Sequence, residues 1–341
     1  MSHESVLAAH EGNGQAAGAP DSGSRGVSLR IVRQLLAALL TLVVVSFVTF
    51  IVFNLRSPRA IAIEILGTHV TPQQITAFIQ LHRLNTPVLE RYGVWLGHFV
   101  RGDMGISAAT NVPVESLVLP RLLRTLILAA CSLVIAVPLS LIAGIGVARR
   151  PGGVGDVLML ALTVVLGMPE FVVGIAVILL LGVWLKLLPV DSAAVAYGTP
   201  VQVIQGYVLP VLTLVIVITP YLIRISRAAI RDVTGQPFVR AAVLRGLPQR
   251  TIMWRQVLPN AAPPIINAVA LNVVYLVGGV IVVENVFGFP GIGQLVVQSV
   301  ATTDTFTTEA CILIMGGIFI VTNALFDLLT VYFTPRLRRA R

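Results

Sequence analysis

The sequence predicts an all-α polytopic membrane protein with six transmembrane helices. Of its 341 residues, 56% are hydrophobic and only 11% are charged, and the mean hydropathy is +0.90. Soluble domains carry about 25% charged residues, so this balance excludes a soluble globular protein. Six apolar runs are long enough to cross a hydrocarbon core of about 30 Å, which needs about 20 residues for each helix.

The six runs extend from near residue 31 almost to the end of the chain. They occupy residues 31–54, 124–147, 157–185, 208–230, 265–283 and 310–332. An even number of spans places both termini on one side. Arginines gather in the tails and in the segments that this topology places inside, with seven of them between Arg224 and Arg255. Both termini are therefore expected to be cytoplasmic, and the net charge of +9 follows topology rather than nucleic-acid binding.

The segments around the spans differ in composition. Residues 1–29 are rich in glycine, alanine and serine and predict a disordered cytoplasmic tail, and residues 336–341 form a basic cytoplasmic tail. After the first transmembrane helix, 30–54, an extracytoplasmic segment covers residues 55–123. Apolar residues recur there at helical spacing in ITAFIQLHRL and LERYGVWLGHFV, which predicts short surface helices. Residues 124–335 form the core domain of five transmembrane helices.

The chain shows no arrangement of residues that is typical of an enzyme. A phosphate-binding P-loop needs Gly-Lys-Ser/Thr, and the only lysine, Lys186, stands between leucines. All five histidines fall outside the predicted spans, and none belongs to an HExxH motif. An intramembrane hydrolase needs a nucleophile and a base that face each other, and no such pair is evident. We expect a protein that is not an enzyme and has no cofactor of its own.

Two acidic residues stand out near the membrane. Glu170 lies midway along the third run, directly after Pro169, where a charge costs about 2.5 to 3.5 kcal/mol. It either faces a hydrated pathway or is protonated or paired within the helix bundle, and both interpretations stay open. Glu284 closes the fifth run at its outer end. Phe287 and Phe289 follow, either as part of an outer gate or as anchors at the membrane interface, and the anchor is favoured slightly.

The segment RAAVLRGLPQRTIMWRQVLPNA lies at residues 240–261, within a cytoplasmic loop of about residues 231–262. Its spacing predicts two short helices joined by a glycine turn. Gly246 suits a left-handed position after a helix end, and Pro248 suits the first turn of the next helix. Such an elbow either contacts a cytoplasmic partner or lies on anionic lipid, and charge alone does not separate the two.

The spacing of this segment resembles the EAA loop of ABC importer permeases. The residues in register with that pattern are Ala241, Ala242, Gly246, Leu258 and Pro259. Arg240 stands where the general pattern has glutamate, and Gln256 stands where it has isoleucine. FVRAAVLRGL is similar to the version of this motif in the peptide permeases.

The resemblance to the DppB/OppB-type dipeptide and oligopeptide permeases extends from about residue 30 over nearly the whole chain. HRLNTPVLERYGVWLGHFVRGDMGIS resembles their outer loop, and GGVIVVENVFGFPGIGQLVVQSVATTD resembles their E-x-V-F-x-x-P-G-x-G-x-L signature. NALFDLLTVYFTPRLRRAR is similar to their closing pattern, with Thr334 in place of an aspartate. LPVDS stands where LPxxG is usual.

The resemblance implies a type I ABC importer permease fold in a bacterial plasma membrane. It implies a homologous second permease subunit of the DppC/OppC type, two ABC ATPase subunits that bind ATP and Mg²⁺, and an extracytoplasmic peptide-binding protein. The elbow would then be the coupling helix, with the residues Arg240, Ala241, Ala242, Arg245, Gly246, Leu258 and Pro259. The implied substrates are short peptides, and the alternatives are nickel complexes, glutathione or another small solute. An ion-coupled secondary carrier is the rival from another class, but only Glu170 lies at mid-depth.

Overall fold

In the computed structural model, the described chain comprises residues 22–54, 57–67, 70–81, 84–149 and 153–333. The predicted basic tail and most of the predicted N-terminal tail lie outside these residues. Within them the secondary structure is helical, apart from an isolated bridge between Ile106 and Pro113. The all-α prediction is thus confirmed.

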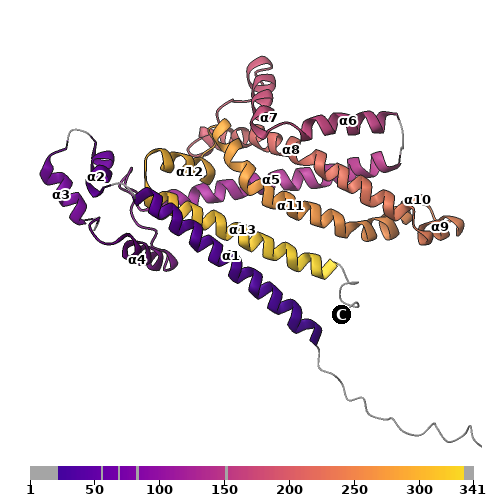
Figure 1. The fold of residues 1–341 in the computed structure, drawn as a ribbon. Helices are drawn as coiled ribbons and strands as arrows, with labels where there is room; N and C mark the ends of the chain where they lie inside the picture. Colours follow the sequence, from indigo (N-terminus) through magenta and orange to yellow (C-terminus); the bar gives the residue numbers. More distant parts are fainter. Residues whose placement is uncertain (1–21, 55–56, 68–69, 82–83, 150–152, 334–341) are drawn as a thin grey trace, which may run out of the picture.

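Five long helices form the body of the molecule (Figure 1). They are α1 (Ser22–Asn54), α5 (Val114–Arg149), α8 (Pro200–Thr234), α11 (Leu258–Val286) and α13 (Thr305–Phe333). The shorter helices are α2 (Pro58–Leu66), α3 (Pro72–Leu81), α4 (Val88–Val100), α6 (Val154–Leu166), α7 (Glu170–Val177), α9 (Pro237–Leu244), α10 (Gln249–Ile252) and α12 (Ile292–Ala301). π-helical segments follow α7 at Ile178–Trp184 and α10 at Met253–Val257.

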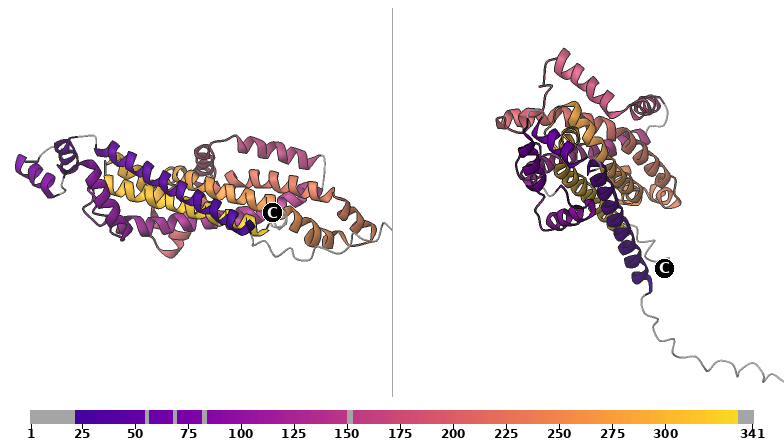
Figure 2. Two further views of the ribbon diagram at one scale, coloured as in Figure 1. Left: turned by 60° about the horizontal axis from the view of Figure 1, so that its bottom comes forward. Right: turned by 60° about the vertical axis from the view of Figure 1, so that its left-hand side comes forward.

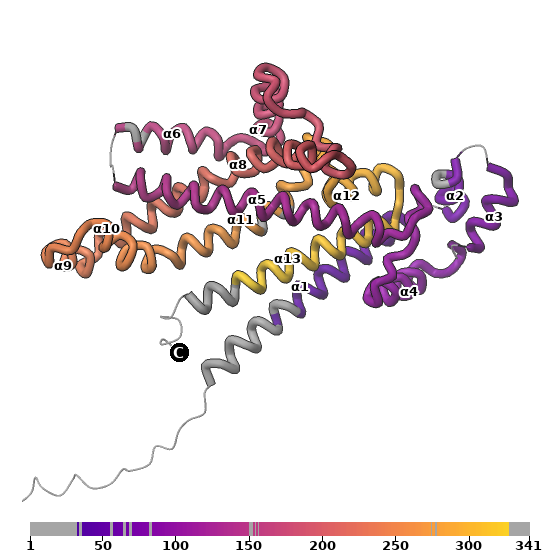
Figure 3. The backbone as a smooth tube through the Cα atoms, turned by 180° about the vertical axis from the view of Figure 1, so that it is seen from behind, coloured from indigo at the N-terminus to yellow at the C-terminus, as the bar shows by residue number. Residues whose placement is uncertain are grey.

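Helix lengths and composition agree with six spans. Four helices are long and apolar enough to cross a membrane, and the number rises to six if each of two bent helix pairs is one span. Helix α8 is the central one, since 61% of its most apolar stretch is buried within the chain, against 11% for α1. Helix α1 packs along α13 at the periphery, as Figures 2 and 3 show from two further sides.

Helices α5 and α8 approach each other closely because one contact position is a glycine. A Cβ on Gly144 would lie 2.7 Å from the Cβ of Ser226, which is closer than two such atoms can pack. Small residues at this point let the two backbones meet, as in many membrane helix pairs. The core beside this contact is apolar and centred on α8, with Leu214, Ile218 and Leu222 almost fully buried.

The third predicted span is not one straight helix. Helix α6 and the α7 segment that ends at Trp184 are inclined by 108° to each other. Gly167 caps α6, and Pro169 precedes α7. Proline disfavours the helical conformation of the residue before it, so the helix breaks at Met168. Glu170, predicted midway along the third run, therefore stands at the start of the second helix of this bent pair.

Two predicted boundaries also shift. Helix α1 begins at Ser22, before the predicted transmembrane helix of residues 30–54. Helix α5 begins at Val114 rather than at residue 124. Val114 and Val118 pack against Ile292 and Leu295 of α12, so tertiary contacts sustain this helix beyond its apolar run.

The short helices α2, α3 and α4 lie together at one end of the molecule, and α9 and α10 lie at the other end (Figure 1). Helix α4 is held against the end of α1 by a cluster of buried aromatic rings. Phe50 of α1 is fully buried, and Tyr92 and Trp95 of α4 are each 5% exposed. The predicted short helices of the long first connection are thus present.

Candidate functional site

The segment from Pro237 to Val257, hereafter the elbow, consists of α9, a tight turn and the start of the next helix. Gly246 in the turn has φ +74°, the left-handed conformation that glycine adopts without strain. The N–H of Gly246 donates to the Val243 carbonyl (2.9 Å), and that of Leu247 donates to the Ala242 carbonyl (3.3 Å). A Cβ on Gly246 would meet nothing within 4 Å, so conformation rather than space requires glycine here. The predicted role of Gly246 as a helix-ending glycine is confirmed.

The second arm of the elbow is not a separate short helix. Helix α10 passes through the π-helical turn directly into α11, and Pro248 is the residue before α10 rather than within its first turn. Leu258 and Pro259 therefore open α11, outside the elbow itself. Leu258 packs partly against the elbow's apolar core, and Pro259 is exposed.

One face of the elbow packs against the end of α8. Val239 and Ala242 of α9 form a small core with Ile252 and Val257, and this core closes on Ile230 of α8. Ala242 is 0% exposed. The resemblance implies that Ala241 and Ala242 both belong to the coupling helix, and of the two Ala242 is occupied inside the elbow. Ala241 alone points outward.

The opposite face of the elbow is exposed and combines apolar and cationic side chains. Leu244 is 88% exposed and Trp254 is 60% exposed. The exposed arginines of this face are Arg240, Arg245, Arg250 and Arg255. Within the described chain none of these four arginines pairs with a carboxylate, and Arg245 donates to the Ala241 carbonyl of its own helix (3.3 Å). Exposed apolar groups rimmed by polar ones are typical of an interaction site.

At the other end of α11, Glu284 is fully buried under the turn that leads into α12. Its carboxylate accepts hydrogen bonds from the Thr125 hydroxyl (2.5 Å) and from the Gln294 N–H (3.1 Å). The hydroxyl oxygen of Thr125 in turn accepts from the Ile292 N–H (2.9 Å). These bonds satisfy N–H groups in the first turn of α12, which have no partner within the helix. We call residues 284–294 the Glu284 turn.

The glycines of the Glu284 turn leave room for the carboxylate. A Cβ on Gly291 would overlap the Glu284 carboxylate, and a Cβ on Gly293 would lie 2.7 Å from the Ile281 Cα and 2.9 Å from Glu284 Oε2. Arg124 donates to the Pro290 carbonyl (3.4 Å). The spacing of glutamate, proline and glycines in ENVFGFPGIG thus describes a capped helix start that is tied to α5.

Phe287 and Phe289 are not interface anchors, which was the favoured expectation. Phe287 is 2% exposed and Phe289 is 0% exposed, because both rings belong to the central apolar core. The Phe289 ring contacts Tyr207 edge to face, with ring centroids 5.0 Å apart, and the Phe287 carbonyl accepts from the Ser192 N–H (2.9 Å). A membrane anchor needs an exposed ring, and neither ring is exposed.

Glu170 meets a second helix at the start of α7. The Tyr275 hydroxyl of α11 donates to its carboxylate, and Gly279 lies beside it, where a Cβ would be 3.4 Å from Glu170 Oε1. Helix α11 bends by 52° between Val273 and Gly278, so the contact is made at the bend. Glu170 is half-buried, and the next turn of its helix reaches the Glu284 turn, since a Cβ on Gly174 would lie 3.3 Å from the Val286 side chain and 3.4 Å from the Phe287 ring.

Sequence reasoning missed two further buried acids. Asp304 accepts from the Ser107 hydroxyl (2.5 Å) and the Thr307 hydroxyl (2.7 Å), which ties the loop before α5 to the start of α13. Glu309 accepts from Ser46 of α1 (2.8 Å). Asp304 and Glu309 lie just before the sixth apolar run, and no local pattern reveals their distant partners. Among the residues described, no group of three histidine, cysteine or acidic side chains is arranged to hold a metal ion.

The chain is similar to known membrane transport components. The family described as "Binding-protein-dependent transport system inner membrane component" matches residues 136–339, and the family of the N-terminal part of such components matches residues 28–129. A probable peptide ABC transporter permease protein of Sinorhizobium fredii, y4tP, is 27% identical over 90% of this chain and 98% of its own length. The nickel import system permease protein NikB of Staphylococcus aureus is 29% identical over 90% of this chain and 92% of its own.

A solved structure shares the fold. A chain of the inward-facing MetNI methionine ABC transporter superposes with a TM-score of 0.52 at 17% sequence identity, and the match covers 64% of this chain and 97% of that one. At that identity the similarity concerns the arrangement of helices alone.

Proposed function

Because the chain belongs to the family of binding-protein-dependent transport system inner membrane components, we propose that this ABC importer permease admits short peptides to the cell. The subunit is a multi-pass plasma membrane protein and a transport component rather than an enzyme. Support for peptides comes from the y4tP relative, which this chain matches over 98% of that protein's length, and from the elbow sequence FVRAAVLRGL.

The proposed coupling to ATP hydrolysis rests on the structure of the elbow. Its inner face is filled by its own apolar core, whereas its outer face exposes Leu244, Trp254 and four arginines. In our proposal this face lies in the cytoplasm, as the arginines favour, and docks on an ATPase subunit that binds ATP and Mg²⁺. A second ATPase would serve a second, homologous permease subunit. Both termini would then be cytoplasmic.

The route from the elbow into the membrane is short. The second arm of the elbow continues into α11 up to Val273, so displacement of the docked elbow would move this part of α11 as a lever. The bend at residues 273–278, where Tyr275 holds Glu170, would be the pivot between α11 and α7. Packed helices move past one another as rigid bodies in such transitions. Glu170 would then respond to the inward and outward states of the pathway.

The Glu284 turn would form part of the side on which an extracytoplasmic binding protein delivers the substrate. It lies at the end of α11 opposite the elbow (Figure 3). A turn whose carboxylate is buried and hydrogen-bonded within the chain suits an entrance to the pathway that keeps its shape. In this arrangement the buried rings of Phe287 and Phe289 fill the helix bundle directly beneath that entrance.

Nickel complexes are the second candidate substrate, since NikB is 29% identical over a similar length. The deciding experiment reconstitutes the complete complex in vesicles, with its binding protein outside and ATP at the elbow side. We expect a labelled dipeptide to accumulate, and radioactive nickel with a chelator not to accumulate. Accumulation of nickel without dipeptide would assign the alternative. Accumulation of either solute by this chain alone, driven by an ion gradient without ATP, would contradict an ABC importer subunit.

A further inference from the structure

A cleft of about 270 Å³ opens between α4, the end of α1 and the start of α13. Its inner wall is aromatic, formed by Phe50, Trp95 and Phe306. Its mouth carries Arg91 and the exposed apolar side chain of Val94. A pocket that combines an aromatic wall with a few placed polar groups is typical of a ligand site.

Arg91 is a cation without a counterion in this cleft. Its guanidinium lies 5.9 Å from the centroid of the Phe50 ring, and burial lowers the pKa of the Arg91 side chain. No carboxylate within the described parts of the chain forms an ion pair with it. A partly desolvated charge gains most from an opposite charge that enters the same site.

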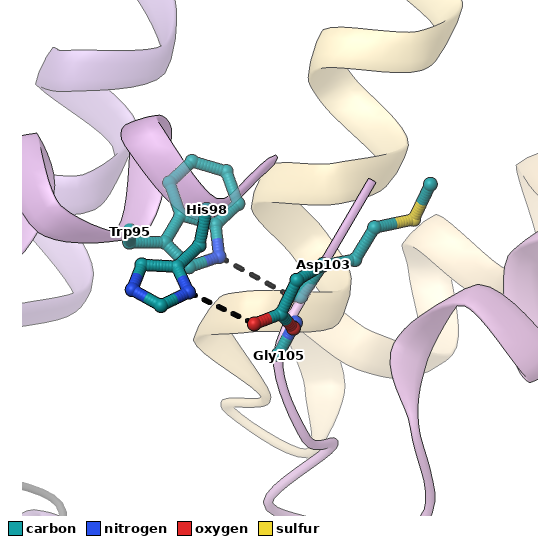
Figure 4. A network of polar contacts seen from close by, with 5 residues as sticks. Trp95, His98, Asp103 and Gly105 are labelled. Atoms are coloured by element: carbon teal, nitrogen blue, oxygen red, sulfur yellow. Dashed lines mark hydrogen bonds and ion pairs between the residues drawn. The ribbon is translucent and has the colours of Figure 1, made fainter. Parts of the chain in front are cut away.

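Two acids line the cleft: Glu90, whose side chain is exposed, and Asp103, which is already engaged. Asp103 accepts from the ring of His98 (2.9 Å) and from the Gly105 N–H (3.0 Å), as Figure 4 shows. Trp95 is fixed beside this network, since its indole N–H donates to the Met104 carbonyl (3.2 Å). The cleft wall is therefore held in place by contacts that leave the Arg91 guanidinium available to an anion.

The position of the cleft along the spans indicates which anion it meets. Phe50 lies near the end of the apolar stretch Leu36–Asn54, and Phe306 lies in the first turn of the apolar stretch Thr305–Phe326. The aromatic wall thus lies where two spans leave the hydrocarbon core, the level at which aromatic residues and lipid headgroups meet. Only 11% of the α1 stretch is buried by this chain, so lipid has access to that side.

We propose that the cleft binds a glycerophospholipid, whose phosphate pairs with Arg91 and whose glycerol and upper acyl carbons lie on Phe50, Trp95 and Phe306. A free phosphate ion shares the charge but makes no use of the aromatic wall. A protein partner would have to reach the cleft at the level of the lipid headgroups, where the two spans end. The bound lipid would join α4 to α1 and α13, and so hold the α2–α4 end of the molecule to the bilayer.

The test places a photoreactive benzoylphenylalanine at Val94 in the full chain, within its complex and in its native membrane. After irradiation, mass spectrometry of the peptide that contains position 94 identifies the adduct. We expect a phospholipid adduct that falls about tenfold in Arg91→Gln, the ratio that 1.4 kcal/mol of lost pairing gives. Arg91→Lys should keep most of the adduct. Arg101→Gln is the matched control, because Arg101 is exposed at the end of the same helix and does not line the cleft.

Competition in the extracted complex separates lipid from free anion. A short-chain phosphatidylethanolamine or phosphatidylglycerol should reduce the lipid adduct, whereas inorganic phosphate should not. Loss of the adduct with inorganic phosphate alone would indicate a site for a free anion. A protein adduct, or a lipid adduct of equal yield in Arg91→Gln and wild type, would overturn the proposal. Because the competition is measured on protein that keeps Arg91, it distinguishes a lipid from a free anion even if Arg91→Gln fails to fold.

Discussion

The elbow and the Glu284 turn stand at opposite ends of α11 and use their polar groups in opposite ways. In the Glu284 turn the charged group is fully buried, and it bonds to Thr125 and Gln294 of the same chain. In the elbow the four arginines are exposed and make no ion pair within the described chain, while Leu244 and Trp254 face outward. The polar groups of the turn find their partners within one subunit, whereas the elbow exposes groups that we propose bind another molecule.

The largest expected effect comes from removing the buried carboxylate. Glu284→Ala leaves the Thr125 hydroxyl and N–H groups of α12 without their acceptor and opens a cavity beneath Gly291. Unsatisfied buried groups cost about 1 to 3 kcal/mol each, so the turn should lose about 3 kcal/mol of stability. The measurement is the thermal unfolding midpoint of the detergent-extracted complex.

The matched control for this change is Glu90→Ala, since Glu90 is exposed on α4 and should alter the midpoint very little. Equal midpoints for Glu284→Ala and Glu90→Ala would show that the turn does not depend on its carboxylate. Docking of the ATPase should persist in Glu284→Ala wherever the protein reaches the membrane, because the elbow lies at the other end of α11.

A smaller effect on stability and a large one on transport is expected for Gly246→Val. A residue with a Cβ atom at the φ of +74° costs about 1 to 2 kcal/mol. The valine variant should therefore adopt a different turn at this position. The subunit should still reach the membrane, but ATP hydrolysis should no longer drive uptake. The measurement pairs dipeptide uptake with ATPase activity in vesicles that hold the complete complex.

Gly235→Val is the control for the turn, because Gly235 ends α8 with φ −72°, a conformation open to other residues. It should retain coupled uptake. Normal uptake by Gly246→Val would remove the support for a coupling elbow, and loss of uptake in both variants would point to bulk rather than to the left-handed turn.

The smallest expected effect on stability comes from Asp103, which is exposed, whereas Glu284 is buried. The hydrogen bond from His98, followed by that from the Gly105 N–H, lowers the pKa of Asp103 below its usual value of 3.8. A lowered carboxyl pKa contributes stability above about pH 4, and that contribution disappears as the pH falls through the folded-state pKa. Because the pair is exposed, it is worth about 0 to 1 kcal/mol.

Asp103→Asn should therefore lower the unfolding midpoint slightly at pH 7 and match the wild type at the lowest pH at which the complex survives. The measurement is the difference in midpoint between variant and wild type along a pH series. A difference that grows as the pH falls would contradict this role of the carboxylate.

Local sequence patterns predicted a good part of both regions. The glycine turn at Gly246 and the helix after it follow from backbone preferences that act over a few residues. The family signature around Glu284 was recognised, but its interpretation was incomplete. Phe289 was expected at the membrane interface and is buried, because its environment is set by Tyr207, far away in the sequence.

The sequence by itself determined that the protein is helical and membrane-embedded, where its apolar runs lie, and that a glycine turn interrupts its most basic segment. Length, hydropathy and backbone conformation are local properties, so the order of residues suffices to reveal them. The tertiary structure alone decided that Ala242 faces inward, that Phe287 and Phe289 are buried, and that Glu284 and Asp304 bond to helix starts and loops far along the chain. A buried carboxylate needs donors from distant segments, and only folding brings those donors within bonding distance.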